Sequence, residues 1–261
     1  MNTPDTIKHI APHERGRLAP LFTGHKPSFL IDAVLQGYQG TAVADDEHTP
    51  RVARLILADV VTFGGDAARP LARKWVAEMP PRRAIWPAPG GWHKLLFAIH
   101  GERLIRMKRH TLSGAELNVE YLRSLAKEIP EGFRIERIGI ELARQIVADS
   151  SLISKDHVTQ FESPEDFVER GVGYVVLAGE RIVSGVSSYA VCDRGIEIQV
   201  NTHPDFRGRG LATAVSARLL VHCLEAGLEA HWDAENAISV KLATRLGYIS
   251  QGTYEMLVFT G

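Results

Sequence analysis

Two kinds of hydrophobic pattern alternate along this chain. Between Ile196 and Val200 every second residue is apolar, as in a strand with one buried face. From Leu211 to Cys223 an apolar residue recurs every four positions, as on the buried side of a helix. Similar stretches occur throughout the sequence, so the pattern predicts a mixed α/β (α+β) fold.

The expected elements are spread over the whole chain. We expect helices at residues 13–22, 28–36, 67–78, 92–100, 114–128, 140–149, 164–170, 211–223 and 236–246. We expect strands at residues 41–44, 53–63, 84–86, 103–109, 133–138, 173–178, 182–191, 196–201, 228–232 and 253–259. Asp66 is the expected N-cap of the helix at 67–78, and Gly247 the expected C-cap of the last helix.

A run of helix-breaking residues, Ile129-Pro130-Glu131-Gly132, marks the expected domain boundary. It divides the 261 residues into an N-terminal α/β domain, 1–130, and a C-terminal domain, 131–261. Both parts are long enough to bury a core of their own.

Composition narrows the function classes. With 45% hydrophobic and 23% charged residues, the chain has the composition of a soluble globular protein. No apolar run is long enough to span a membrane, and residues 1–10 lack the layout of a signal peptide, so we expect a cytoplasmic protein. The two cysteines, Cys192 and Cys223, match neither a disulfide scaffold nor a metal site, and no metal is expected.

Charge is divided unevenly between the two parts. Residues 1–130 hold 18 basic and 13 acidic side chains, and residues 131–261 hold 12 and 18. Neither part is basic enough for a nucleic-acid partner, and none is expected, nor is a membrane. The acidic part would favour a cationic substrate, although solvated surface charge explains it as well. The sequence leaves a homodimer open.

One segment of the C-terminal part carries the strongest chemical signal. A strand runs into a loop with two glycines, Gly208 and Gly210, and the loop opens a helix. Backbone N–H groups in such a turn can bind an anion, and glycines let a phosphate approach the main chain. Arg207 and Arg209 add positive charge, and Ala212 keeps the first helical turn narrow. The spacing fits neither a P-loop nor a dinucleotide fingerprint. It predicts a diphosphate site, with a plain tight turn as the alternative.

These residues resemble the GNAT N-acetyltransferase superfamily. Arg207-x-x-Gly210-x-Ala212 matches the family signature Arg/Gln-x-x-Gly-x-Gly/Ala, and Asn236-x-x-Ser239 with Leu246-Gly247-Tyr248 resembles its second conserved block. The chain also resembles a two-domain bacterial subfamily that includes zwittermicin A resistance acetyltransferases, on residues 184–189 and 232–243.

The resemblance implies a fold for each part. Residues 131–261 would form a GNAT domain, with a mixed, splayed central sheet flanked by helices. The N-terminal domain would wall the acceptor site and could be a degenerate copy of the same fold.

The resemblance also implies where acetyl-CoA binds. The main chain of Val200 and Thr202 would pair with the pantetheine arm, and Asn236 and Ser239 would steady the pantetheine or phosphate side. The turn would hold the pyrophosphate through Arg207, Gly208, Arg209, Gly210, Leu211, Ala212 and Thr213.

Catalysis requires a base, an oxyanion donor and an acid. An amine near pKa 10 must lose a proton before it attacks, and Glu197 is the first candidate base, with His203 second. Glu197 could instead bind the substrate ammonium or face solvent. The Val200 backbone N–H is the oxyanion donor that the resemblance implies. The family's usual tyrosine acid falls on Ala243, which we do not expect to be catalytic.

Three other tyrosines could supply the proton to the leaving thiolate. They are Tyr189, Tyr248 and Tyr254, of which we assign Tyr254. The predicted function is therefore acetyl-CoA-dependent acetylation of a primary amine on a small molecule, for example an antibiotic. A non-catalytic coenzyme A-binding regulatory module is an alternative because the usual tyrosine is missing. A protein acetyltransferase is another, suggested by the basic stretch at residues 103–109.

Overall fold

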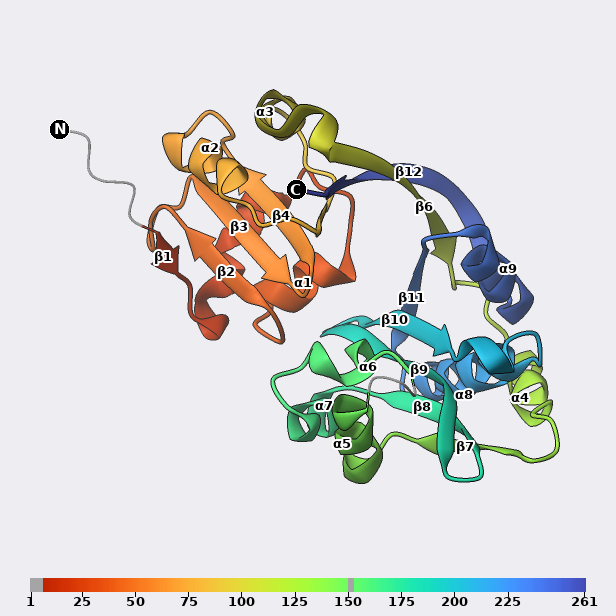
Figure 1. Ribbon diagram of the computed structural model, residues 1–261. Coiled ribbons are helices and arrows are strands. Elements are labelled where there is room, and N and C mark those ends of the chain that lie inside the picture. Colours follow the sequence, from red (N-terminus) through yellow and green to blue (C-terminus); the bar gives the residue numbers. More distant parts are fainter. Residues whose placement is uncertain (1–6, 150–152) are drawn as a thin grey trace. The chain divides into compact units, whose positions relative to one another are not determined.

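The computed structural model describes residues 7–149 and 153–261 (Figure 1). The chain forms two compact units, Met1–Lys108 with Tyr254–Gly261, and Arg109–Thr253. Each unit combines helices with a mixed sheet, as the hydrophobic pattern predicts. This division differs from the expected boundary at residue 130. Residues 109–130 pack with the second unit, and the last strand returns to the first.

The first unit opens with two helices flanked by short strands. Its elements in chain order are β1 (Lys8–His9), the 3-10 helix η1 (Pro12–Phe22), α1 (Phe29–Leu35), β2 (Thr41–Ala44), β3 (Val52–Leu57), β4 (Val60–Gly65), α2 (Pro70–Ala77), β5 (Arg83–Ile85), α3 (Trp92–His100), the 3-10 helix η2 (Gly101–Arg103) and β6 (Leu104–Ser113). β6 begins in this unit and ends in the other.

Two local expectations for the first unit are wrong. The single strand expected at residues 53–63 is a hairpin, in which β3 and β4 pair from Leu57↔Val60 onward. The turn uses Ala58 at a φ of 53°, a left-handed conformation for which alanine gives no sequence signal. Asp66 is not the helix N-cap, because α2 begins later and Arg69 takes that position.

The second unit also consists of strands and helices. Its elements are α4 (Val119–Lys127), β7 (Phe133–Arg137), α5 (Ile140–Ala148), α6 (Asp156–Thr159), α7 (Pro164–Arg170), β8 (Gly173–Ala178), β9 (Arg181–Cys192), β10 (Gly195–Thr202), the 3-10 helix η3 (Pro204–Phe206), α8 (Leu211–Glu225), β11 (Glu229–Ala234), α9 (Ala237–Leu246) and β12 (Ile249–Phe259). As expected, Gly247 ends α9 in a left-handed conformation.

The strand pairings of the two units match one for one. In the first unit β1, β2, β3 and β4 pair antiparallel in sequence, and β4 pairs parallel with β5 across α2. In the second unit β7, β8, β9 and β10 pair antiparallel in the same way, and β10 pairs parallel with β11 across α8. One topology therefore occurs twice in the chain.

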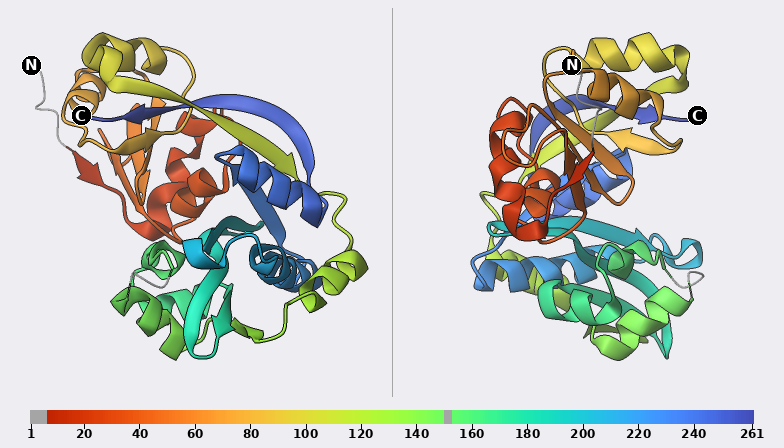
Figure 2. Two further views of the ribbon diagram at one scale, coloured as in Figure 1. Left: turned by 45° about the vertical axis from the view of Figure 1, so that its right-hand side comes forward. Right: turned by 90° about the vertical axis from the view of Figure 1, so that its left-hand side faces the viewer.

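The last strand of each repeat is exchanged. The end of β6 pairs with β11, and the end of β12 pairs with β5, both antiparallel. β6 and β12 are also neighbours in the strand order (Figure 2). Because the end of β12 pairs with β5, residues 254–261 belong to the first unit.

Each unit has its own hydrophobic core. In the first, Phe63 and Trp92 stack with ring centroids 4.9 Å apart, beside the buried Trp75. In the second, α8 packs against Trp232 and Tyr248. None of the helices in the described residues is long and apolar enough to cross a membrane.

Candidate functional site

The two central strands of the second unit separate part of the way along their length. β10 pairs with β11 only from Gly195↔Glu229 to Glu197↔His231. Beyond that point β10 continues to Thr202, while β11 pairs on its other side with β6. The sheet is therefore splayed, as the resemblance implies, and one edge of β10 opens after Glu197.

The backbone of β10 offers polar groups along this open edge. His203 donates its N–H to the Val183 carbonyl oxygen of β9, over 2.9 Å. Because N–H groups alternate in direction along an extended strand, those of Val200 and Thr202 point away from β9. The two residues expected to pair with pantetheine thus present main-chain groups on the unpaired side.

A register shift lies next to the point where the strands part. The partners of Glu197 and Ile198 on β9 are Ala190 and Ser188, so Tyr189 is an extra residue. Such bulges increase local twist and re-aim side chains, and they are common beside active sites. This one falls at the half-buried Tyr189, which precedes Ala190, the register partner of Glu197.

The turn after β10 has the conformation that the glycines predict. Gly208 and Gly210 have φ of 77° and 79°, and an added Cβ would meet nothing within 4 Å at either position. Gly210 is the N-cap of the 15-residue α8 and provides no side-chain cap. Since Ala214 donates the first helical hydrogen bond, to Gly210, the N–H groups of residues 211–213 precede it. The turn can therefore accept an anion at the main chain.

Positively charged side chains surround this turn. Arg207 Nε donates to the Thr202 carbonyl oxygen (3.2 Å), and the guanidinium of Arg209 lies 5.2 Å from the centre of the Phe206 ring. Arg181 at the start of β9 reaches the same ring from 5.4 Å and contacts His203 Nε2 at 3.0 Å. Arg181 escaped the sequence analysis because it precedes the motif by more than twenty residues.

His203 is held by its neighbours. Its Nδ1 lies 3.3 Å from the backbone nitrogen of Asp205, and its Nε2 lies 3.0 Å from the Arg181 guanidinium. Its expected role as the second candidate base stays a prediction.

The sheet face opposite α8 is polar at the point of separation. Glu197 Oε2 and His231 Nδ1 are 2.6 Å apart, with side chains 11% and 19% exposed. On the same face of β11, Asp233 pairs with Arg109 of β6, over 2.6 Å. Sequence reasoning identified Glu197 but missed His231, although polar and apolar residues alternate along β11.

Asn236 and Ser239 have structural partners in the second unit. The Asn236 side-chain oxygen caps α9 by accepting from the Ser239 N–H (3.0 Å). The Ser239 hydroxyl accepts from Trp232 Nε1 at 3.0 Å. Their expected role toward coenzyme A stays a prediction.

The tyrosines named as possible acids lie in different surroundings. Tyr248 is buried and donates its hydroxyl to the Ala230 carbonyl oxygen (2.7 Å). Burial, followed by Cys223 and Glu197, raises the pKa of Tyr248 well above its ordinary value, which makes it a poor acid. Tyr254 belongs to the first unit, where the Lys26 ammonium lies 4.4 Å from its ring centre. Its catalytic role stays a prediction.

Ala243, at the usual tyrosine position, is a fully buried part of the core of the second unit. It has no group that could exchange a proton.

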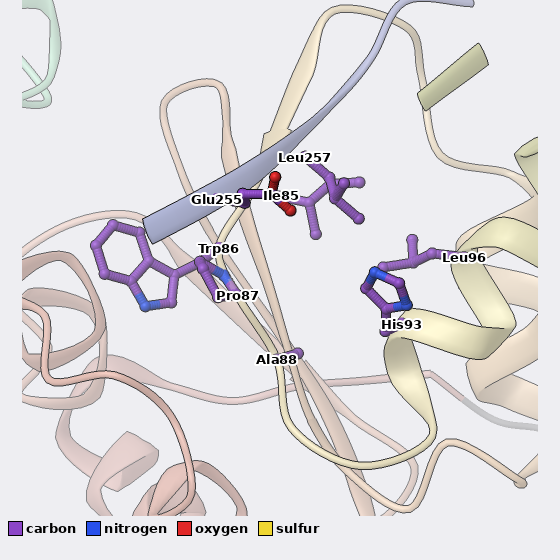
Figure 3. Close-up of a pocket in the computed structure, with 8 residues that line it drawn as sticks. All are labelled: Ile85, Trp86, Pro87, Ala88, His93, Leu96, Glu255 and Leu257. Carbon is purple, nitrogen blue, oxygen red and sulfur yellow. The ribbon is translucent and has the colours of Figure 1, made fainter. Parts of the chain in front are cut away.

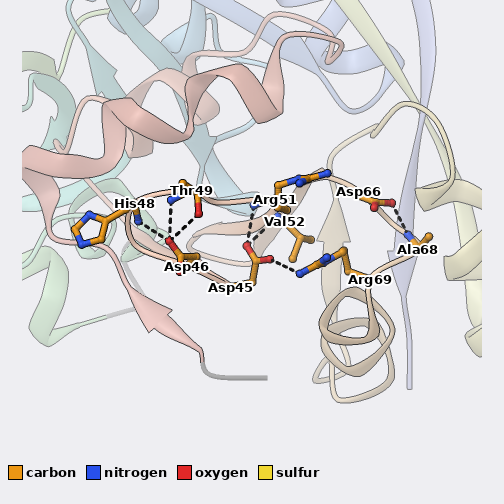
Figure 4. A network of polar contacts seen from close by, with 9 residues as sticks. All are labelled: Asp45, Asp46, His48, Thr49, Arg51, Val52, Asp66, Ala68 and Arg69. Carbon is orange, nitrogen blue, oxygen red and sulfur yellow. Dashed lines mark hydrogen bonds and ion pairs between the residues drawn. The ribbon is translucent and has the colours of Figure 1, made fainter. Parts of the chain in front are cut away.

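In the corresponding turn of the first unit, carboxylates bind nearby backbone N–H groups and an arginine (Figure 4). Pro70 at the start of α2 lacks an N–H, and Asp66 Oδ1 accepts the Ala68 N–H over 2.9 Å. Asp45 accepts from the backbone N–H groups of Arg51 and Val52, at the start of β3, and pairs with Arg69 (3.4 Å). The Ala68 N–H is thus already bound to a carboxylate and Pro70 offers none, which argues against a second cofactor site at this turn.

The first unit does contain a cavity of about 170 Å³ (Figure 3). Its walls come from β5 and the segment after it, from α3 and from β12, and they are Ile85, Trp86, Pro87, Ala88, His93, Leu96, Glu255 and Leu257. Trp86 lines this cavity, whereas Trp75 and Trp92 belong to the core of the first unit.

The structure also shows the surroundings of the two cysteines and of the side chains that could bind a metal ion. Cys192 and Cys223 are both buried, and they are not joined in a disulfide. Within residues 7–149 and 153–261, no group of three His, Cys, Asp or Glu side chains could hold a metal ion.

Known proteins resemble this chain over nearly its whole length. The profile of the GNAT acetyltransferase family matches residues 19–257. The uncharacterized N-acetyltransferase YdfB of Bacillus subtilis (strain 168) is 25% identical over 232 residues, which make up 85% of this chain and 86% of YdfB.

Solved structures agree with this result. A GCN5-related N-acetyltransferase-like protein from Streptococcus suis 89/1591 is 30% identical with a TM-score of 0.82, over 95% of this chain and 98% of that one. A tandem GNAT protein from the clavulanic acid biosynthesis pathway shares the fold at 14% identity, with a TM-score of 0.57 over 97% and 96% of the two chains.

Proposed function

Since this chain belongs to the GNAT acetyltransferase family and is an acyltransferase, we propose that it transfers acetyl from acetyl-CoA to a primary amine of a small molecule. GNAT enzymes in general use acetyl-CoA. We further propose where acetyl-CoA binds, that an amine accepts the acetyl group, and which residues act on that amine.

One observation carries the cofactor assignment. The open edge of β10 leads directly into a turn with two left-handed glycines and an uncapped helix N-terminus. A pantetheine arm can pair with the main chain of Val200 and Thr202, as an added strand would. The turn from Arg207 to Thr213 then receives the pyrophosphate, with the guanidinium groups of Arg207 and Arg209 beside it.

The acceptor assignment is supported by the polar face where the strands part. Glu197 and His231 lie on that face, at the last paired position before the open edge. A carboxylate there attracts a cationic amine and can orient it toward the thioester. The resemblance to the subfamily that includes zwittermicin A resistance acetyltransferases favours an antibiotic amine within this class.

The overall reaction of an ammonium with acetyl-CoA releases one proton. The bound ammonium loses a proton to a base, and the neutral nitrogen forms a bond to the thioester carbonyl carbon. The Val200 N–H faces the open edge and can stabilise the oxyanion. The carbon–sulfur bond then breaks, and the thiolate takes up the second proton of the nitrogen, directly or through an acid such as Tyr254. The products are the amide and free coenzyme A.

The test combines binding with turnover. Saturating acetyl-CoA at about 100 times its Kd should stabilise the fold by roughly 2.7 kcal/mol, which corresponds to a rise in Tm of several degrees. Free thiol should then appear with a panel of small amines, together with one acetylated amine per thiol. If the wild-type protein shows no rise in Tm, the cofactor site is wrong.

A coenzyme A-binding regulatory module is the second candidate. The observation in its favour is Ala243, which occupies the usual position of the acid and lies in the core. A clear rise in Tm with acetyl-CoA, without thiol release for any amine or for a protein mixture, would favour this function over the enzyme.

A further inference from the structure

The contact between Glu197 and His231 defines the state of the imidazole. The two atoms, Oε2 and Nδ1, are 2.6 Å apart. An ionised carboxylate can only accept hydrogen bonds, so Nδ1 carries the proton and donates it. In the neutral ring the lone pair is then on Nε2, which is the nitrogen that can act as a base.

The position of the pair in the sheet connects it to the reaction. Glu197 and His231 are partners in the parallel register, and no β10–β11 pair follows them. They share one face because partners in parallel strands point the same way. The next residue of β10 that presents its N–H to the open edge after Ile198 is Val200, the proposed oxyanion donor. The pair therefore lies where the open edge of β10 begins, three residues before Val200 along the strand.

We propose that His231 Nε2 is the general base of this enzyme, and that Glu197 is a positioning residue that fixes its tautomer. The inference rests on the proposed acetyl transfer and names the proton acceptor at that same site. Nε2 removes one proton from the substrate ammonium, which frees the nitrogen lone pair to attack the carbonyl carbon. The ring becomes an imidazolium, stabilised by the Glu197 carboxylate, and passes its proton to water after coenzyme A has left.

Three titratable groups of the second unit, Tyr248, Cys223 and Asp233, do not compete for this proton. The Tyr248 hydroxyl donates to the carbonyl of Ala230, the residue before His231, and burial keeps its pKa high. Burial also raises the pKa of the Cys223 thiol, to about 12. Asp233, on the same face, is paired with Arg109. Of these groups, the Glu197 carboxylate is the charge in direct contact with the imidazole.

Kinetics distinguish His231 from Glu197 as the base. We expect His231→Gln to lower kcat/KM at pH 7 by about 10²–10⁴-fold, the usual contribution of a general base. The defect should shrink as pH rises, because solvent then supplies neutral amine. We expect Glu197→Gln to lose only about tenfold, since its amide oxygen still accepts from Nδ1. In Glu197→Gln, the fall of kcat/KM on the acid side of the pH profile should move to lower pH. The reason is that the imidazolium has lost a stabilising charge.

The exposed His48→Gln in the first unit is the matched control and should leave the profile unchanged. The proposal is overturned if Glu197→Gln loses as much as His231→Gln without a shift of the acid limb. It is also overturned if His231→Gln keeps more than a tenth of the wild-type kcat/KM.

A measurement without substrate separates this proposal from the proposed function. Protein labelled with ¹⁵N-histidine, with His231→Gln used for assignment, reports the tautomer of each neutral ring by NMR. We expect His231 to carry its proton on Nδ1 in the wild type. A proton on Nε2 would overturn the inference whether or not the enzyme acetylates an amine. A proton on Nδ1 without turnover on any amine would instead count against the proposed function alone.

Discussion

His157 Nδ1 lies 2.8 Å from the hydroxyl oxygen of Ser187, in the fully buried interior of the second unit. The Ser187 hydroxyl donates to the His157 carbonyl oxygen (3.0 Å), so Nδ1 must be protonated and donate to Ser187. Among the described residues, Nε2 of this ring has no hydrogen-bond partner. Burial lowers the pKa of His157 from 6.5 to about 4. The ring is therefore neutral in the folded protein near pH 7.

This histidine should make the fold sensitive to acid. Between pH 6.5 and about 4 the unfolded chain binds a proton at this position that the folded chain does not, so stability falls as pH drops. At about 1.4 kcal/mol per pH unit, the loss across the window is about 3 kcal/mol. Urea unfolding between pH 8 and 4.5 measures it.

The matched variant is His157→Asn, whose side-chain amide can still donate to Ser187. It should be less stable than the wild type at pH 8 because it leaves a small cavity. Its stability should nevertheless fall less steeply on acidification. Equal slopes for the two proteins would show that His157 does not titrate in this window.

The parts of the site that follow from neighbouring residues could be predicted from the sequence. The turn before α8 is one example, because Gly208 and Gly210 adopt the left-handed conformations that their spacing suggests. The hairpin at Ala58 could not be predicted in this way, since alanine and aspartate give a weaker turn signal than glycine or asparagine.

Relationships between distant segments required the structure. The exchange of β6 and β12 depends on which strands meet in space, and hydrophobic pattern alone does not specify strand partners. For the same reason the sequence pointed to Glu197 but not to His231, which is its partner across 34 residues. The resemblance suggested a degenerate copy of the fold, but the first unit repeats no cofactor motif, because α2 begins with Pro70 where α8 follows a glycine.

The left-handed glycine at the start of α8 should be needed for acetyl-CoA binding. Gly210→Ala adds a Cβ at a φ of 79°, which costs about 1–2 kcal/mol in backbone strain and disturbs the anion site. We expect the Kd for acetyl-CoA, measured by calorimetry, to rise at least tenfold, with a lower Tm.

Gly227 provides a control at the other end of the same helix. Its φ is 70°, and an added Cβ would likewise meet nothing within 4 Å. Gly227→Ala should lower the Tm to a similar extent and leave the Kd unchanged. A similar loss of affinity in both variants would mean that strain in α8, rather than the turn, controls binding.

Two substitutions of Asn236 should separate its role as the N-cap of α9 from a contact with acetyl-CoA. Asn236→Ala removes the acceptor for the Ser239 N–H and should lower stability by about 1 kcal/mol. Asn236→Asp keeps that acceptor, so its stability should match the wild type, while its new charge should raise the KM for the anionic acetyl-CoA severalfold. An unchanged KM in Asn236→Asp would restrict this residue to the cap.

Phenylalanine substitutions should identify the acid that protonates the leaving thiolate. If Tyr254 is that acid, the wild-type kcat falls at high pH once its hydroxyl has lost its proton. Tyr254→Phe should lower kcat and abolish this high-pH limb. The measurement is kcat against pH with saturating acetyl-CoA and amine.

Tyr248→Phe is the control for a structural effect. It removes the hydrogen bond to the Ala230 carbonyl oxygen, which should cost about 0.5–1.5 kcal/mol of stability. It should keep the high-pH limb, because burial holds the pKa of Tyr248 far above the range of the assay. If Tyr254→Phe keeps the limb and Tyr189→Phe loses it, the acid is instead the residue at the β9 bulge.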